Sequence, residues 1–181
     1  VTPHEGTLEV KPATLTVQAD NQQIAYPANR PATSALTYTF VSGAASGETP
    51  AYTGNHGYTG LAGDPLSTGN YPAAITDGTL KLANNGAFLA ANYKLVVLPG
   101  DLKVVNGTFS VDLTGGEWTY NGDPHGPTLT GTTTGDTVTY YTKDSGGNWV
   151  PSATIPTVTN VNDGKVEVKV EVTRSGYEPA T

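Results

Sequence analysis

Cysteine is absent from the 181-residue sequence, which excludes disulfide scaffolds, thiolate zinc sites and cysteine nucleophiles. Histidine is scarce as well, and each of the three, at positions 4, 56 and 125, stands beside glycine, proline or asparagine. We expect them in solvated loops rather than in a nucleophile–histidine–acid triad. The sequence therefore predicts no catalytic residues and no enzyme activity.

Basic residues are also few, because nine lysines and arginines stand against sixteen acidic residues and give a net charge of −7. Nucleic-acid binding requires clustered basic residues, so the sequence excludes that class of partner. The longest uninterrupted apolar run, residues 95–99, is far shorter than the ~18 to 20 residues of a membrane span, and we expect no membrane insertion. The spacings of an EF-hand, a phosphate loop or a dinucleotide fingerprint are missing, so no cofactor and no metal are expected.

The sequence does contain β-favouring residues in alternating patterns. In the clearest strand, residues 166–172, four valines alternate with charged residues and share one face. The preceding Asn162-Asp163-Gly164 is a turn signal, so we expect a hairpin there. Further alternations at residues 15–17, 36–40, 79–82, 93–97 and 137–141 are separated by connectors rich in glycine, proline, asparagine and aspartate.

Short strands separated by turns predict an all-β protein made of small antiparallel sheets. An immunoglobulin-like sandwich is the first choice. A β-grasp-like sheet with one short helix stays open as the alternative, because residues 87–91 can form one helical turn.

An internal repeat is the most informative feature of the sequence. The pattern Gly-x-Leu-x-Val-x-x-x-Thr-Φ-x-Val, in which Φ is apolar, occurs at residues 6–17 and again at residues 100–111. The same offset of 94 residues carries Tyr26 onto Tyr120. We interpret each copy as a strand that closes one domain, a short crossover, and a strand that opens the next.

The repeat predicts three segments. Residues 1–10 are the terminal strand or linker of a preceding repeat, residues 11–106 form a first β domain, and residues 107–181 form a second β domain that lacks its last strand. Such a domain has an exposed sheet edge, which invites strand addition. We expect residues 1–10 to be either disordered or docked on an edge, for example that of the second domain in a neighbouring molecule.

Aromatic residues supply the only candidate ligand contacts. Trp118 and Tyr120 are two residues apart and share one side of a strand, and we expect them to pack in the core or at its edge. Trp149 follows a glycine-rich turn and either caps the core or lies open on the surface. Tyr140 and Tyr141 point to opposite faces, so one of them is exposed. The candidate ligand-contact residues are therefore Trp149 and Tyr141.

Several segments together resemble the MBG-type repeat of large bacterial surface proteins. They are residues 15–26, residues 36–43, Gly69-Asn70-Tyr71-Pro72, residues 92–95 leading to Gly100-Asp101-Leu102-Lys103-Val104, and in the second half Trp118-Thr119-Tyr120-Asn121-Gly122, residues 135–140 and Arg174-Ser175-Gly176-Tyr177. The likeness covers nearly the whole chain, although the sequence has Tyr26-Pro27 where the family has Tyr-Gly, and its stretch from Gly43 to Gly69 is longer. The resemblance implies tandem stalk domains without catalytic residues.

Two functions follow as expectations. The first is a non-catalytic structural stalk or spacer of a bacterial cell-surface adhesin, which is extracellular, attached to the cell wall or secreted, and whose partners are neighbouring repeats. The second is a module that binds a host glycan, a mucin or a matrix protein through exposed aromatic residues of the second domain. An open Trp149 indole beside a concave polar face favours binding, whereas a buried one favours the spacer.

Overall fold

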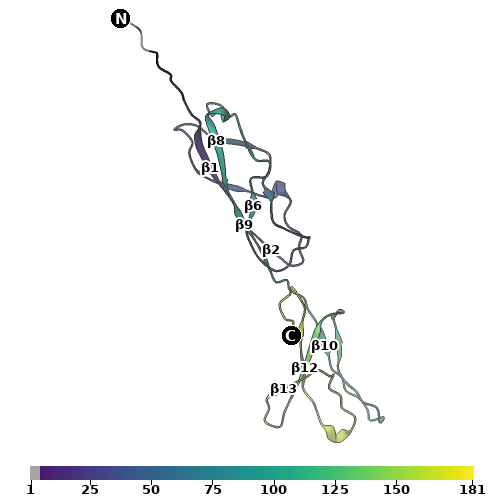
Figure 1. Cartoon of the computed structure of the whole chain (residues 1–181). Coiled ribbons are helices and arrows are strands. Elements are labelled where there is room, and N and C mark those ends of the chain that lie inside the picture. Colours follow the sequence, from purple (N-terminus) through teal and green to yellow (C-terminus); the bar gives the residue numbers. More distant parts are fainter. Residues whose placement is uncertain (1–4) are drawn as a thin grey trace. The chain divides into compact units, whose positions relative to one another are not determined.

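The computed structural model describes residues 5–181, which form two compact units that divide between Val105 and Asn106 (Figure 1). Strands and three short 3-10 helices make up the regular structure of these residues, so the expected all-β class is confirmed. The boundary that the repeat predicts after residue 106 lies next to this division.

Unit 1 contains nine strands arranged in three sheets. Its strands are β1 (Ala13–Ala19), β2 (Gln22–Ala25), β3 (Tyr38–Ser42), β4 (Ala51–Thr53), β5 (Gly57–Tyr58), β6 (Gly69–Thr76), β7 (Lys81–Ala83), β8 (Tyr93–Leu98) and β9 (Gly100–Val105), and its 3-10 helices are η1 (Thr33–Ala35) and η2 (Ala90–Asn92). The sheet orders are β3-β1-β8, β2-β9-β6-β5 and β4-β7. The helical turn expected at residues 87–91 overlaps η2.

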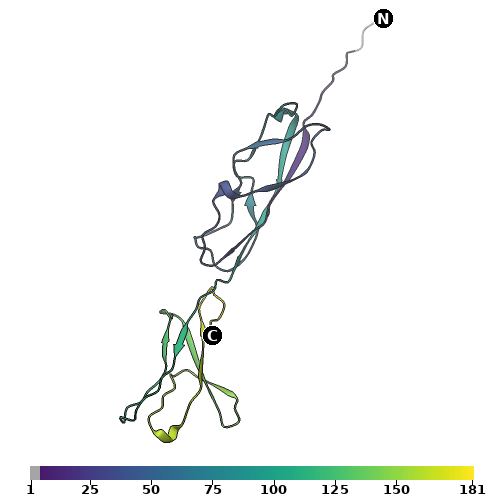
Figure 2. The same ribbon diagram turned by 180° about the vertical axis from the view of Figure 1, so that it is seen from behind.

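Alternation explains how the first strand of unit 1 packs. Leu15, Val17 and Ala19 are buried, while the residues between them are only partly covered, because successive side chains of a strand point to opposite faces. β1 lies beside β8 and pairs with it in parallel from Ala13↔Tyr93 to Gln18↔Leu98 (Figures 1 and 2). The first strand of the unit and one of its last two are therefore direct neighbours.

β9 crosses from the first sheet into the second immediately after β8. A side chain at Gly100 would meet the carbonyl oxygen of Ala19 at 2.6 Å, so only glycine allows the backbone to pass β1 this closely. Beyond that point β9 pairs with β2 on one side and with β6 on the other, and the side chains of its own Leu102 and Val104 are buried. The strand is the centre of the second sheet.

Unit 2 is smaller and has one core cluster. Its strands are β10 (Asp112–Thr114), β11 (Thr128–Thr130), β12 (Thr137–Lys143), β13 (Trp149–Ser152) and β14 (Val168–Thr173), and its 3-10 helix is η3 (Val161–Asp163). The sheet orders are β10-β11 and β13-β12-β14. Tyr140, Val170 and Val172 form the buried core, and Phe109 and Leu113 pack against it.

The hairpin expected at Asn162-Asp163-Gly164 is wrong. β14 pairs with β12, not with a strand that precedes this turn, and β13 pairs with the other side of β12. Instead, the Asp163 carboxylate accepts hydrogen bonds from the backbone N–H groups of Thr159 and Asn160 at 2.7 Å each, which closes a local loop. The turn chemistry therefore serves a loop, and the strand begins at Val168 rather than Val166.

The strand expected at Leu8–Val10 is also absent. Residues 5–12 lie outside every strand, and the side chains of Leu8 and Val10 are fully exposed. The rest of the predicted terminal segment, residues 1–4 with His4, lies outside the described residues. The sequence also suggested that residues 1–10 dock on the sheet edge of the second domain. At Val172 of β14 that edge is occupied, because Ala180 of the same chain exchanges two backbone hydrogen bonds with it.

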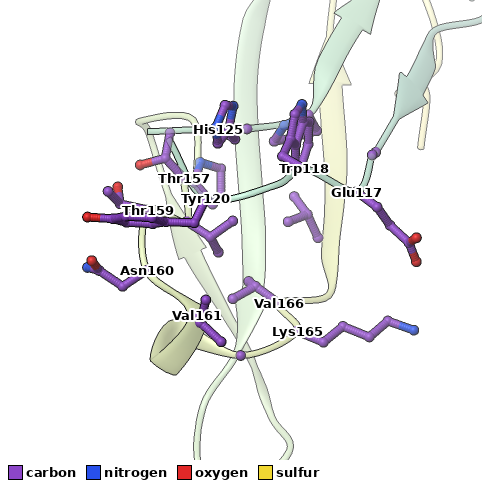
Figure 3. Close-up of a pocket in the computed structure, with 18 of the residues that line it drawn as sticks. Glu117, Trp118, Tyr120, His125, Thr157, Thr159, Asn160, Val161, Lys165 and Val166 are labelled. Atoms are coloured by element: carbon purple, nitrogen blue, oxygen red, sulfur yellow. The ribbon is translucent and has the colours of Figure 1, made fainter. Parts of the chain in front are cut away.

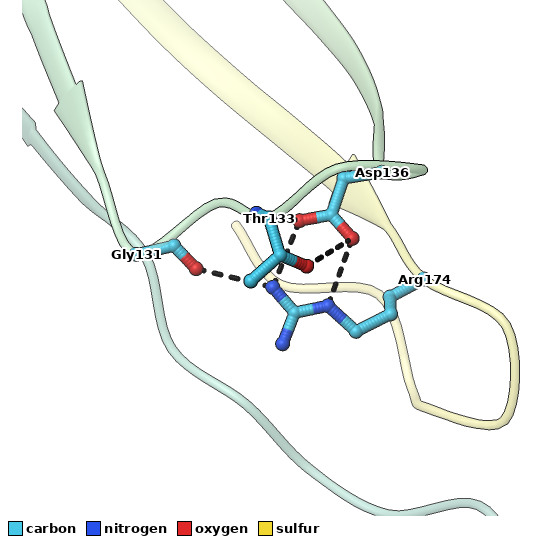
Figure 4. Close-up of polar contacts among 4 residues, drawn as sticks. All are labelled: Gly131, Thr133, Asp136 and Arg174. Atoms are coloured by element: carbon cyan, nitrogen blue, oxygen red, sulfur yellow. Dashed lines mark hydrogen bonds and ion pairs between the residues drawn. The ribbon is translucent and has the colours of Figure 1, made fainter.

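An ion pair fastens the end of β14 to the loop before β12 (Figure 4). The Arg174 guanidinium donates two hydrogen bonds of 2.8 Å to the Asp136 carboxylate and a third, of 3.1 Å, to the carbonyl oxygen of Gly131. Its Cζ lies 4.1 Å from the ring centroid of Phe109, so the cation also stacks on an aromatic ring. The hydrogen bonds from Arg174, together with one from the backbone of Thr133, lower the pKa of Asp136 to about 2.

We predict that acid weakens unit 2 through this carboxylate. An unfolded aspartate has a pKa of about 3.9, so the contribution of Asp136 is complete above that value and is lost as the pH falls toward 2. Thermal unfolding measured from pH 6 to pH 2 should show a smaller acid dependence in Asp136→Asn, which starts from a lower melting temperature. Asp112→Asn, an exposed carboxylate on β10, is the matched control, and equal acid dependence of the two variants would contradict the assignment.

Candidate functional site

A cleft of about 650 Å³ lies in unit 2 (Figure 3). It is lined by three stretches of chain, which are Gly115–Tyr120, Pro156–Val161, and Gly164–Val166 with Val168, and by Leu113 and His125–Pro127. None of these lining residues belongs to β12, and the cleft is formed by loops, by Leu113 of β10, by Val161 of η3 and by the start of β14.

Trp118 and Tyr120 stand on one wall of the cleft, and the expectation that they pack in the core is wrong. Their exposed fractions are 47% and 63%, and neither residue belongs to a strand. The indole of Trp118 stacks on the imidazole of His125, with ring centroids 5.1 Å apart and planes 8° from parallel. A side chain at Gly116 would come within 2.8 Å of the indole, so the absence of a side chain there leaves room for the ring.

Hydrogen bonds fix the loop that carries His125. Its Nε2 lies 2.9 Å from Oδ1 of Asn121, which also accepts a hydrogen bond from the backbone N–H of Asp123. The backbone N–H and C=O groups of His125 both pair with Val158 at 2.8 Å, which ties this loop to the opposite wall. These hydrogen bonds hold the loop of His125 against the opposite wall of the cleft.

The other wall of the cleft is apolar at one end and polar at its middle. Val161 and Val166 expose 82% and 41% of their surface, and Thr157, Thr159 and Asn160 add hydroxyl and amide groups. Glu117 and Lys165 are the carboxylate and the ammonium among the lining residues, and both extend away from the aromatic rings (Figure 3). The cleft can thus take an extended apolar or amphipathic segment, but it does not bring an acid and a base together on a substrate.

Trp149 and Tyr141, the residues predicted as ligand contacts, do not line this cleft. They come together on the opposite face of the sheet from the core, where Trp149 stands across from Lys143 and Tyr141 across from Lys169. The Nζ of Lys169 lies 4.8 Å from the ring centroid of Tyr141 and 5.0 Å from that of Trp149, and Lys143 Nζ lies 5.2 Å from the indole. Trp149 is 37% exposed, with ammonium groups over its ring rather than a concave polar surface beside it.

Two histidines depart from the expectation of solvated loops. His56 is buried, because its Nδ1 donates a hydrogen bond of 2.8 Å to the carbonyl oxygen of Thr76 and the ring of Tyr38 packs 5.7 Å away. His125 is half-buried in its stack with Trp118. Among residues 5–181 no three histidine, aspartate or glutamate side chains converge into a group able to hold a metal ion.

Comparison of the chain with protein-family models, with curated proteins and with solved structures found no match. In the part of the chain that the structure describes, no helix has the length and apolar character needed to cross a membrane.

We predict that Lys169 stabilises unit 2 through its two aromatic neighbours. Lys169→Met removes the cation while keeping an apolar side chain, and it should lower the free energy of unfolding by about 0.5–1 kcal/mol in urea titrations, the usual strength of such contacts at exposed sites. Lys165→Met is the control, because Lys165 lies over neither ring of this pair. An equal loss in both variants would refute the role of the aromatic contacts.

Proposed function

We propose that this chain is a non-catalytic structural stalk segment of a bacterial cell-surface adhesin, and that it acts outside the cell as a spacer under tension. The observation that carries the proposal is the parallel pairing of β1 with β8 over six consecutive residue pairs, from Ala13↔Tyr93 to Gln18↔Leu98. The resemblance to MBG-type repeats and the acidic, cysteine-free composition support it.

Parallel pairing matters because of the direction in which tension acts. Force enters unit 1 through the start of β1 and leaves it through the chain that follows β8. Since the two strands run the same way, these forces pull them in opposite directions along their axes, and the hydrogen bonds between them are loaded together. The second sheet repeats this arrangement, because β2 and β9 are also parallel from Gln22↔Leu102 to Ala25↔Val105.

The chain on either side of the division between the units is hydrogen-bonded within its own unit. Val105 still accepts a hydrogen bond of 2.9 Å from the backbone of Tyr26 in unit 1, and Gly107 already donates one of 2.9 Å to Gly176 and accepts one of 2.8 Å from Glu178 in unit 2. The side chain of Asn106, the residue between them, bonds to Glu178 at 2.9 Å.

We predict a strong dependence of the unfolding force on where unit 1 is pulled. Because the native chain has no cysteine, handles can be attached at will. Lys11→Cys with Asn106→Cys loads β1 against β8 in shear, whereas Lys11→Cys with Ser46→Cys peels β1 from its antiparallel neighbour β3. We expect the first pair to give a peak force at least about twofold higher in single-molecule pulling, since forced unfolding reports the unfolding barrier. Equal forces would remove the mechanical argument.

A second candidate function is recognition of a host glycan, mucin or matrix protein by unit 2. The exposed rings of Trp118 and Tyr120 beside polar groups of the cleft favour it. They favour it more than Trp149 and Tyr141 do, because lysines lie over those two rings.

A glycan and mucin array probed with the full chain separates the two functions. We expect no binding from a spacer. Binding that is lost in Trp118→Ala but kept in Trp149→Ala would instead assign unit 2 to ligand recognition through the cleft.

A further inference from the structure

The repeat allows residues of unit 2 to be matched with those that surround β9 in unit 1. The repeat offset of 94 residues places Gly116–Thr119 of unit 2 opposite β2 of unit 1, and Tyr120 opposite Tyr26. Nearer the chain's end an offset of 95 aligns Gly164-x-Val166-x-x-x-Val170 with Gly69-x-Tyr71-x-x-x-Ile75. Ile75 and Val170 are both buried, and each pairs with a tyrosine, Tyr58 and Tyr140 respectively. Gly164, Val166 and Val161 of unit 2 then correspond to Gly69, Tyr71 and Leu66 of unit 1.

In unit 1 both of these segments are hydrogen-bonded to β9. β2 pairs with it in parallel, with Gln22↔Leu102 and Ile24↔Val104, and the first half of β6 pairs with it in antiparallel, with Tyr71↔Leu102 and Gly69↔Val104. The buried side chains of Leu102 and Val104 form a core cluster with Leu66, and Ile24, Tyr26 and Tyr71 pack against it. β9 thus fills the space between β2 and β6.

In unit 2 the counterparts of β2 and of the start of β6 line the cleft, and residues 116–119 and 164–166 belong to no strand and pair with none. The apolar residues that are exposed there are the counterparts of residues that pack on the β9 side chains. Val161 is 82% exposed where Leu66 is 1% exposed, and Trp118 and Tyr120 stand exposed at the positions of Ile24 and Tyr26. The cleft has the position and the lining of an unfilled strand site.

We propose that this cleft is a strand-accepting groove and that its occupant is the segment Gly6–Val10 of a second copy of the chain. The segment has the pattern of β9, because Gly6, Leu8 and Val10 repeat Gly100, Leu102 and Val104. It lies outside every strand of its own molecule, with Leu8 and Val10 fully exposed. Inserted between the two walls, it pairs with backbone on both sides and buries those two side chains against Trp118, Val161 and Val166.

The register also fixes which charges meet. In unit 1 Lys103 of β9 stands between Asn70 and Gln23. The counterpart of Lys103 is Glu9, and the counterparts of Asn70 and Gln23 are Lys165 and Glu117. In the filled groove Glu9 therefore lies between a cation on one side and an anion on the other, and changing either neighbour shifts the affinity in a known direction.

The first test measures self-association of the full chain by analytical ultracentrifugation across concentration. We expect head-to-tail association of the native chain, and loss of it in Leu8→Ser with Val10→Ser. Thr7→Ser with Lys11→Gln is the matched control. It changes two neighbouring residues but keeps Leu8 and Val10, so it should associate as the native chain does. A native chain that stays monomeric up to millimolar concentration would overturn the proposal.

The second test adds a synthetic peptide of residues 5–12 to the Leu8→Ser, Val10→Ser chain, whose own donor segment is inactive, and follows tryptophan fluorescence. Val166→Glu inside the groove should weaken peptide binding at least about tenfold, whereas Val150→Glu, an exposed valine of β13, should not. Glu117→Lys should tighten binding and Lys165→Glu should weaken it. Equal binding of a scrambled peptide, or the same loss in Val150→Glu, would overturn the assignment.

A third variant fills the groove from its own chain. Residues 98–105 appended after Thr181 supply a copy of β9, and this variant is expected to neither self-associate nor bind the peptide. Undiminished association would show that the copies meet elsewhere, and a neutral glycan that quenches Trp118 where the peptide does not would assign the groove to a sugar instead. These outcomes leave the pulling experiment untouched, because the inference does not rest on the spacer proposal.

Discussion

The backbone groups of a buried strand need hydrogen-bonding partners on both sides, and the arrangement of unit 1 follows from how β9 meets this need. β8 lies beside β1, and after Pro99 the chain crosses at Gly100 into the second sheet, where β9 runs between β2 and β6. The buried residues Leu102 and Val104 thus belong to a strand that is paired on both edges. One continuous stretch of thirteen residues, 93–105, therefore supplies a strand to each of the two larger sheets of the unit.

In unit 2 the residues that correspond to β2 and to the start of β6 belong to no strand. The one buried cluster of this unit gathers around β12 and β14, where backbone pairing is complete enough to exclude water. Toward the start of β14 the chain leaves the sheet, and apolar residues such as Val166 remain exposed. Exposure here is a consequence of missing backbone pairing, and composition does not explain it, since Val166 continues the alternation of Val168 and Val170.

Period-two alternation predicted the strands that lie next to a core. Residues 15–17, 93–97 and 137–141 all fall within observed strands, because one face of each is buried and the pattern records it. The sequence pattern does not indicate which strand each of them pairs with. The turn at Asn162–Gly164 is locally sound, yet β14 pairs with a strand more than twenty residues earlier in the chain, since the buried face of β12 sets its neighbours. Local turn chemistry fixes a loop, and the core fixes the pairing.

The candidate site was harder to predict for a related reason. The expectation for Trp118 assumed that a domain poor in large apolar residues must bury each of them, but burial also requires chain that covers the side chain, and unit 2 as described leaves Trp118 47% exposed. The 94-residue offset held the necessary signal, because it aligns Trp118 with Ile24, a residue that packs against the β9 side chains. The repeat thus carries two kinds of information. It marks where the second domain begins. It also shows, through unit 1, which strand packs against the residues that correspond to the exposed ones of the cleft.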